Sequence, residues 1–163
     1  MNGRIIQLNI KPKTGRERGL PKSPAPEIVV TASGVIGDFN KYRTERLASD
    51  PEMAVLIYPV EMLEKLNEER WAVKPGDLGE NITTEGLSYD DYFPGGQYRA
   101  GGALLEVTKA CDPCRNLALL PYVGQEKLKQ FIRALIGRRG WYAKVIEGGT
   151  IRVGDIIRII SSE

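Results

Sequence analysis

Short apolar segments separated by glycines run through most of this chain, and they limit what it can fold into. Two of these segments resemble each other, G-G-Q-Y-R-A-G-G-A-L-L-E-V at residues 95–107 and G-G-T-I-R-V-G-D-I-I-R-I at residues 148–159. Each predicts a hairpin of strand, tight glycine turn and strand, because glycine readily adopts the positive φ angles that such turns need. Many short strands with glycine turns predict a mainly β fold, a barrel or a sandwich.

Two segments depart from this β pattern. Residues 59–69 predict a helix that opens at Pro59, whose missing N–H suits a first turn. Residues 125–136 carry apolar side chains at the spacing of an amphipathic helix, and Gly137 is a plausible stop. We expect strands at residues 1–10, 27–33 and 54–58, a loop over the proline-rich residues 11–27, and a single domain over residues 1–163.

The composition excludes several classes of function. The net charge is only +2 and is spread along the chain, which argues against nucleic acid as a partner. No segment approaches the ~20 apolar residues that span a bilayer, and no signal-peptide pattern is present, so we expect a cytoplasmic protein without a membrane partner. The chain has no histidine and two cysteines, which excludes Ser-His-Asp and Cys-His catalysis and the common zinc sites. It carries no haem, flavin or iron–sulfur motif.

A polar, glycine-rich segment at residues 74–87 is the first candidate site. It reads K-P-G-D-L-G-E-N-I-T-T-E-G-L, and Asn81 and Thr83 within it can donate and accept hydrogen bonds. Gly76 and Gly79 allow backbone amides to approach a ligand closely, which suits a polar heterocycle with a phosphate. The alternative is a barrel loop whose polar side chains satisfy their own backbone.

The second candidate is a pair of cysteines in V-T-K-A-C-D-P-C-R-N-L at residues 107–117. Cys111 and Cys114 form a C-x-x-C motif, with Lys109 before it and Arg115 after it. Nearby cations favour the thiolate, the form of cysteine that binds metals and attacks sulfur. The alternative is a pair of small buried hydrophobic residues. A thioredoxin-like motif is disfavoured, because no βαβ pattern surrounds the pair.

A third segment, at residues 136–155, is basic. Arg138, Arg139 and Lys144 in it can meet a phosphate, or they can form the solvated end of a helix, where cations favour the helix dipole. Trp141 and Tyr142, which follow the two arginines, are better explained as packing residues. The segment therefore leaves both interpretations of its cations open.

Several motifs together resemble the small stand-alone proteins of the MOSC family, named for the C-terminal part of molybdenum cofactor sulfurases. They are G-D-L-G-E-N-I-T-T-E-G, then A-G-G-A-L-L-E-V-T-K ending in P-C, then R-G-W-Y-A-K-V-I-E-G-G-T-I-R-V-G-D. Their order and spacing agree with the family from about residue 28 to residue 160. The resemblance implies a mainly β fold, a closed or partly closed MOSC-type β-barrel with two to three peripheral helices.

The resemblance also implies a function. Some MOSC domains bind the molybdenum cofactor (molybdopterin), with the cysteine of the P-C motif bonded to the metal, and this cysteine is Cys114 here. Related proteins reduce N-hydroxylated compounds, so we expect a reductase with Cys114 as molybdenum ligand and catalytic residue, supplied by an electron-donor protein. Other members belong to cofactor sulfuration. In this alternative Cys114 carries a persulfide that a pyridoxal-phosphate cysteine desulfurase supplies.

The same resemblance gives the expected cofactor-binding residues. Asn81 matches the asparagine of the family's loop, and Thr83 lies beside it. Stand-alone members often carry a histidine in the loop after a Gly-Asp pair. This chain has no histidine, so Lys41 or Arg43 must replace it there, or the activity differs.

These expectations have a geometric consequence. Separate loops must meet if they bind one ligand, so Asn81, Thr83 and Cys114 should converge on one concave surface. A pterin phosphate needs cations or amides nearby. At least one of four cations should therefore lie at the rim of this surface: Lys41, Arg43, Lys109 or Arg115.

Overall fold

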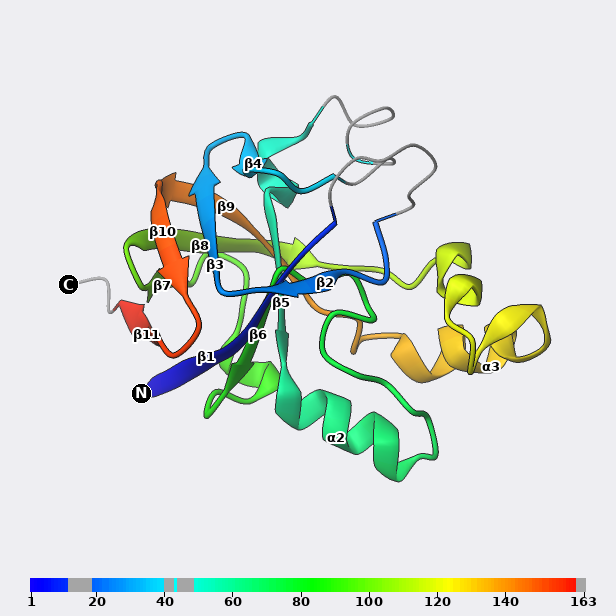
Figure 1. The fold of residues 1–163 in the computed structure, drawn as a ribbon. Helices are drawn as coiled ribbons and strands as arrows, with labels where there is room; N and C mark the ends of the chain where they lie inside the picture. The colour runs from blue at the N-terminus through cyan, green and yellow to red at the C-terminus, as the bar shows by residue number, and fades with distance from the viewer. Residues whose placement is uncertain (12–18, 40–42, 44–48, 161–163) are drawn as a thin grey trace.

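A computed structural model describes residues 1–11, 19–39, 43 and 49–160. Within these residues, seven strands close into a barrel in the order β11-β7-β8-β9-β5-β6-β1, and β1 pairs again with β11. They are β1 (Asn2–Ile10), β5 (Val55–Pro59), β6 (Ile82–Glu85), β7 (Gln97–Ala100), β8 (Ala103–Ala110), β9 (Trp141–Glu147) and β11 (Ile156–Ile160). Figure 1 shows the barrel with its helices on the outside. The predicted mainly β barrel is confirmed.

A short strand extends the barrel sheet at β1. β2 (Ser23–Ala25) pairs antiparallel with β1, with Asn9 opposite Pro24. A proline is tolerated there because β2 is an edge strand, where the missing N–H leaves no ladder bond broken. The prediction of a loop over residues 11–27 is therefore wrong at residues 23–25, and residues 12–18 of that segment lie outside the described residues.

The two similar glycine segments form different structures. The first is the predicted hairpin, since β7 and β8 pair with Ala100 opposite Ala103. The second is not a hairpin. β10 (Gly149–Arg152) joins β3 (Glu27–Thr31) and β4 (Gly34–Val35) in a separate three-stranded sheet, whereas β11 pairs with β7 and β1.

The connection after β10 explains this difference. Val153 N–H donates to the Pro26 carbonyl at 3.1 Å, and Gly154 N–H donates to the Ile5 carbonyl at 2.8 Å. These partners lie far away in the sequence, so distant backbone holds the connection and its two flanking strands diverge into different sheets. The prediction of a second hairpin is therefore wrong.

Two α-helices among the described residues match the predicted ones to within one residue at each end. They are α2 (Val60–Glu68) and α3 (Gly124–Leu135), and short 3-10 helices occur as η1 (Pro51–Met53), η2 (Tyr89–Asp91) and η3 (Arg115–Leu119). Pro59 directly precedes α2. Gly137 has a φ of 73° just after α3, a conformation that ends a helix and favours glycine.

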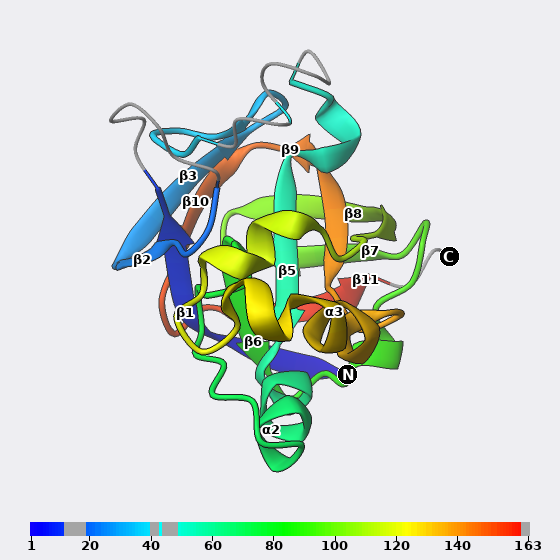
Figure 2. The same ribbon diagram turned by 90° about the vertical axis from the view of Figure 1, so that its right-hand side faces the viewer.

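Two hydrophobic clusters meet at β5. Ile57 points into the barrel cluster, whereas Tyr58 joins the second cluster with Leu66 of α2 and Phe131 of α3. β5 is buried along its whole length, because the barrel interior covers one face and the helical layer covers the other. Figure 2 shows α3 lying in front of β5. The candidate site lies at the edge of this helical layer.

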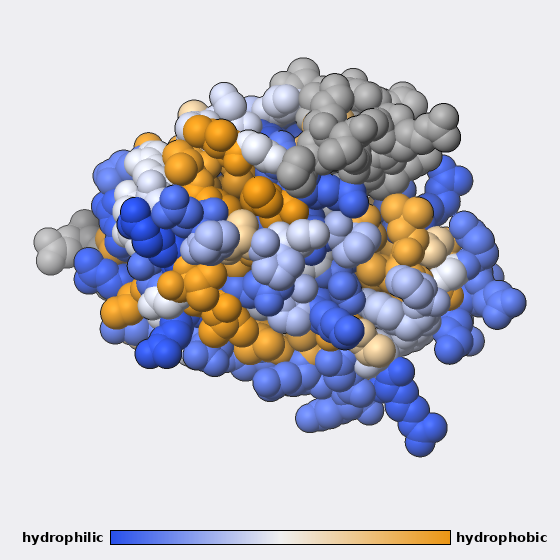
Figure 3. Space-filling model, viewed as in Figure 1, coloured by the Kyte–Doolittle hydropathy of each residue, from blue (hydrophilic) through white to orange (hydrophobic). Residues whose placement is uncertain are grey.

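Some apolar surface remains on the second sheet. Val29 of β3 is 38% exposed, and Ile36, just after β4, is 62% exposed. Figure 3 shows apolar atoms gathered over β3 and β4 on this face of the molecule. Neither residue lines the cavity that contains the cysteines, so this surface is separate from the candidate site.

Candidate functional site

A cavity of about 430 Å³ opens beside the two cysteines. Its wall comes from the segment before β2, from η1 and β5, from the loop before β6, from the end of β8 with the loop after it and η3, and from β9 with the segment before it. The wall residues with polar or ionisable side chains are Lys109, Cys111, Asp112, Cys114, Asn116, Arg139 and Tyr142. The volume lies within the usual range of small-molecule sites, ~300–1,000 Å³.

The two cysteines present different surfaces to this cavity. Cys111 is 5% exposed, and its backbone N–H donates to the Gly140 carbonyl at 2.8 Å, which fixes it between β8 and β9. Cys114 is exposed and directly precedes η3. Both thiols are free. Cys114 is therefore the cysteine that a ligand or a partner protein can reach.

Arg139 is a buried cation in the same wall. Its side chain is 4% exposed, and its Nε and Nη1 atoms are buried without a hydrogen-bond partner. The preceding residue, Arg138, differs. It lies partly exposed and forms two hydrogen bonds with the carboxylate of Glu69, at 2.6 and 2.9 Å. Of these two arginines, only Arg139 lies in the cavity wall.

A buried carboxyl group acts on Arg139. Glu80 is fully buried, and its Oε1 accepts hydrogen bonds from Gly76 N–H at 2.5 Å and from the Thr83 hydroxyl at 3.1 Å. Its Oε2 has no hydrogen-bond partner. Burial raises the pKa of the Glu80 carboxyl, and the hydrogen bond from Gly76 offsets only part of this shift.

The guanidinium of Arg139 nevertheless stays charged. Burial is the largest effect and lowers its pKa, but the nearby ionisable groups of Cys111, Tyr142, Cys114 and Glu80 together act the other way, and the net pKa is raised. Tyr142 also stays protonated at neutral pH, because burial first and Cys111 second raise the pKa of its hydroxyl. The cavity wall therefore combines a fixed positive charge, a protonated phenol and two thiols.

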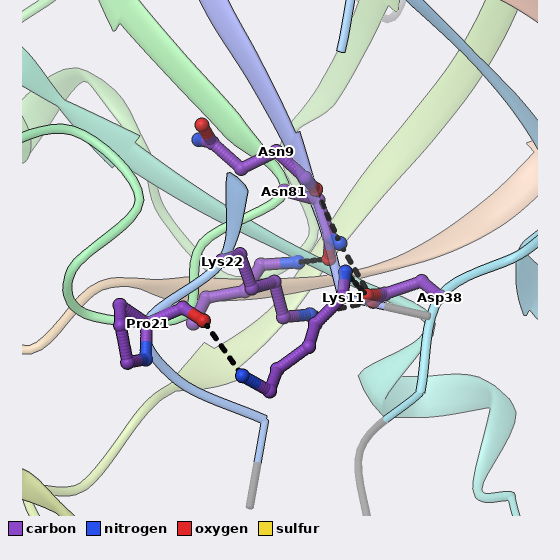
Figure 4. A network of polar contacts seen from close by, with 7 residues as sticks. Asn9, Lys11, Pro21, Lys22, Asp38 and Asn81 are labelled. Carbon is purple, nitrogen blue, oxygen red and sulfur yellow. Dashed lines mark hydrogen bonds and ion pairs between the residues drawn. The ribbon is translucent and has the colours of Figure 1, made fainter. Parts of the chain in front are cut away.

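A second polar cluster lies beside this cavity, and Figure 4 shows it. The Lys22 ammonium is 2.5 Å from Oδ2 of Asp38, and the Asn81 amide donates to the same oxygen at 2.8 Å. The other oxygen of Asp38 accepts from the Lys11 backbone N–H at 2.8 Å. Asn81 Oδ1 accepts from the Leu56 N–H at 3.1 Å. This cluster ties the end of β1, the segment before β2, the turn at Asp38 and the loop before β6 together.

The structure brings the predicted site residues together in two groups. Cys114 and Lys109 line the 430 Å³ cavity. Asn81 and Arg43 line a smaller hollow of about 40 Å³. The residues common to the two walls are Met53, Leu56, Gly79 and Tyr142. Lys41 lies outside the described residues.

Two predicted residues lie in neither wall. Thr83 is fully buried, where its hydroxyl donates to Glu80 and accepts from Asn9, so the expectation that it shares the concave surface is wrong. Arg115 is exposed outside the cavity wall. Lys109 lines the cavity that contains Cys114, and its role as a cation for a cofactor stays a prediction.

The glycines of the loop before β6 serve packing. A Cβ on Gly76 would lie 2.5 Å from the Lys22 carbonyl oxygen, and a Cβ on Gly79 would lie 2.8 Å from the Gly19 carbonyl oxygen. Both contacts are too close for any side chain, and both φ angles are positive. These glycines let the segment before β2 approach the loop, which is a different use from the predicted approach to a ligand.

The sequence did not single out Glu80 and Tyr142 as site residues, and it gave Arg139 only together with Arg138 as a possible phosphate contact. Arg139 carries the same side chain as its neighbour Arg138, and no local pattern distinguishes the inward one from the outward one. Glu80 reads as an ordinary loop carboxylate. Only the way the loop before β6 packs against the start of β9 reveals these positions.

Two features are absent from the described residues. No three cysteine, aspartate or glutamate side chains gather closely enough to hold a metal ion by themselves. In this part of the chain, no helix is long and apolar enough to cross a bilayer.

The chain is similar to two proteins known by sequence. It is 24% identical over 139 residues to protein YiiM of Escherichia coli, an alignment that covers 83% of this chain and 60% of YiiM. It is 28% identical over 168 residues to the uncharacterized protein YflK of Bacillus subtilis, covering 96% of this chain and 73% of YflK. The chain thus spans less than two thirds of the length of E. coli YiiM.

Solved structures and a family comparison agree. YiiM from Geobacillus stearothermophilus matches with a TM-score of 0.75 and 27% identity, over 98% of this chain and 75% of that one. The YUAD protein of Bacillus subtilis shares the fold, with a TM-score of 0.78 at 19% identity over 100% and 98% of the two chains. A sequence model of the MOSC domain matches residues 44–158. The chain therefore belongs to the MOSC domain family, which is associated with binding of the molybdenum cofactor.

Proposed function

We propose that this protein binds the molybdenum cofactor in the 430 Å³ cavity, with Cys114 as the molybdenum ligand, and reduces N-hydroxylated compounds. The observation that supports this most is the exposed thiol of Cys114 in the wall of that cavity. Cys114 also matches the cysteine of the family's P-C motif, and the proline of that motif, Pro113, lies in the same wall.

The residues present fit such a cofactor. A thiolate is a soft ligand that suits molybdenum, and the pterin part supplies further sulfur ligands. An anionic pterin phosphate requires positive charge nearby, and Lys109 in the cavity wall provides it. Leu56 and Leu78 add apolar wall against which a flat heterocycle can pack. Donor type, charge and volume therefore all suit the group.

The side chains of the cavity wall would have separate roles in binding the cofactor and the substrate. When bound, the cofactor supplies the two-electron chemistry that no side chain of this protein can supply. Cys114 holds the metal, Lys109 attracts anionic groups at the rim, and the apolar wall limits the access of water. The Tyr142 hydroxyl is protonated, so it can donate a hydrogen bond to an oxygen of a substrate in the cavity.

The remaining expected residues act from the surroundings of the cavity. Asn81 and Arg43 hold the adjoining wall, because their side chains hydrogen-bond to backbone groups there. The Thr83 hydroxyl donates a hydrogen bond to Glu80 and so fixes that carboxyl group. Electrons come from a partner protein, since the sequence carries no haem, flavin or iron–sulfur motif of its own.

A sulfur carrier is the second candidate, and the exposure of Cys114 favours it. In this function Cys114 receives a persulfide from a cysteine desulfurase and passes the sulfur on. An exposed thiol beside the buried Cys111 suits transfer between proteins, because the outer sulfur can be reached by a partner's nucleophile.

Metal and sulfur analysis distinguishes the two functions. The protein is expressed in a host that makes the cofactor, purified without oxidation, and measured for molybdenum, pterin and Cys114 persulfide. Stoichiometric molybdenum with pterin supports the reductase, which then reduces an N-hydroxylated base with an artificial electron donor. Persulfide on Cys114 without metal supports the carrier. A protein with neither would overturn both.

A further inference from the structure

Arg139 has an unusual position for a charged side chain. It lines the cavity and is only 4% exposed, yet its Nε and Nη1 atoms have no hydrogen-bond partner. Burying a cation without hydrogen bonds normally lowers the stability of a protein strongly. A folded protein tolerates this cost where a ligand completes the site.

Glu80 does not complete it. The two side chains attract each other, but Glu80 Oε2 is itself without a hydrogen-bond partner, so no hydrogen bond joins that oxygen to Arg139. Burial also raises the pKa of the carboxyl, which favours its neutral form. The Glu80 carboxyl therefore compensates the positive charge of Arg139 only weakly. Glu80 serves as a positioning residue on the side away from the cavity.

We infer that Arg139 forms an oxyanion-binding site in the cavity wall, and that it takes a phosphate group or a similar tetrahedral oxyanion. A guanidinium binds such groups with two parallel N–H donors, a geometry that a lysine cannot reproduce. This site stands on the cavity alone and goes beyond the proposed reductase. It would exist whether or not molybdenum binds at Cys114.

The other side chains of the wall agree with an anionic ligand. Lys109 supplies a second positive charge, and Tyr142 supplies a protonated hydroxyl as a donor. Asp112 is the opposing charge in the wall, but it is exposed, so solvent and salt screen it. The balance of charge at the buried end of the cavity is positive.

The oxyanion can come from two sources, a free ion or the phosphate of an organic ligand. We would titrate the full chain, purified without cofactor, with inorganic phosphate, sulfate and molybdate, and separately with phenyl phosphate, by calorimetry and thermal unfolding. Similar affinity for phosphate and phenyl phosphate indicates a free-ion site. Clearly tighter binding of phenyl phosphate indicates that the apolar wall contributes and that the ligand is a phosphate ester. Either result supports the inference.

Matched variants assign the site to one residue. Arg139→Gln should weaken oxyanion binding about tenfold or more, the loss expected for charged hydrogen bonds. Arg138→Gln is the control, because that neighbouring arginine already pairs with Glu69, and it should bind as the unmodified protein does. Arg139→Lys keeps the charge and should retain weakened binding, which covers the case in which the glutamine variant fails to fold.

Thermal unfolding separates binding from a purely structural role. Added phosphate should raise the unfolding temperature of the unmodified protein and not that of Arg139→Gln. Without oxyanion, the glutamine variant should be at least as stable as the unmodified protein, because a buried unpaired charge has been removed. The inference is wrong if Arg139→Gln binds oxyanions normally. It is also wrong if the unmodified protein binds none of these oxyanions. A loss of stability in Arg139→Gln would then make Arg139 only the partner of Glu80.

Discussion

Two buried cations, Lys22 and Arg139, line two neighbouring hollows that share part of their walls. They differ in whether their side chains have hydrogen-bond partners. Lys22 is paired with Asp38 at 2.5 Å, and that carboxylate is also bound by Asn81 and by the backbone of Lys11. Arg139 lies in the neighbouring cavity with two nitrogens unpartnered. The first cluster is saturated with internal hydrogen bonds, and the second is not.

The difference separates stability from binding. A saturated buried network holds segments in place and offers nothing to a ligand, because every donor already has an acceptor. An unsaturated buried donor lowers stability unless a ligand satisfies it. The Lys22–Asp38–Asn81 cluster should therefore govern folding, and the cavity around Arg139 and Cys114 should govern binding. Each variant below tests one side of this division.

The largest effect is expected at Cys114. Cys114→Ser should lower molybdenum-dependent activity by at least ~100-fold, beyond the loss typical of outer residues of a metal site. Serine is a harder ligand and stays protonated at neutral pH, so it does not replace a thiolate. Cofactor content and reduction of an N-hydroxylated base, both under reducing conditions, measure the effect.

Cys111→Ser is the matched control and should keep most of the activity. Both cysteines line the same cavity, but Cys111 is buried. Equal loss in the two variants would favour a dithiol mechanism. Full activity of Cys114→Ser would remove the proposed ligand altogether.

The next effect is on folding. Asp38→Ala leaves Lys22 buried without its partner and should lower the free energy of unfolding by about 3 kcal/mol. Glu69→Ala breaks the exposed pair with Arg138 and should cost less than ~1 kcal/mol. Urea unfolding of both variants measures the difference. Equal costs would show that burial of the Lys22–Asp38 pair does not matter.

A smaller loss of stability is expected at Asn81. Asn81→Ala leaves the buried Leu56 N–H unpaired, which should cost about 1–3 kcal/mol. The same variant tests whether Asn81 also contacts a cofactor. If Asn81 acts only by holding the wall, lowering the temperature should restore cofactor content as the fold recovers. A stable variant that still lacks cofactor would indicate direct contact.

The smallest effect is a pH dependence from Glu80. Its pKa in the folded protein lies above the ordinary 4.5, mainly because of burial, so the folded state holds the proton more tightly than the unfolded state. Stability from this group is complete below pH 4.5 and is lost as pH rises through the raised pKa. Glu80→Gln cannot ionise, so its stability relative to the unmodified protein should increase with pH. Parallel unfolding curves from pH 4 to about pH 8 would contradict this.

Local sequence features predicted much of the fold. The spacing of apolar residues located α2 and α3, and glycine turns with short apolar runs indicated a mainly β barrel. The hairpin at residues 95–107 follows from its own turn residues. The segment at residues 148–159 has similar residues, but bonds from its connection to Ile5 and Pro26 separate its strands. A local pattern cannot reveal such distant partners.

By itself, the sequence determined the two helices, most of the strand segments, the family and the cysteine that follows proline, because periodicity, turn chemistry and motif order are properties of neighbouring residues. Only the tertiary structure decided which polar groups form hydrogen bonds within the protein and which remain free to bind a ligand. In the sequence, Asn81 and Thr83 look like ligand contacts, but their side chains form hydrogen bonds within the protein. Arg139 looks like its neighbour Arg138, but it lines the cavity, and its Nε and Nη1 atoms have no hydrogen-bond partner. Hydrogen-bond satisfaction depends on groups that folding brings together from separate parts of the chain.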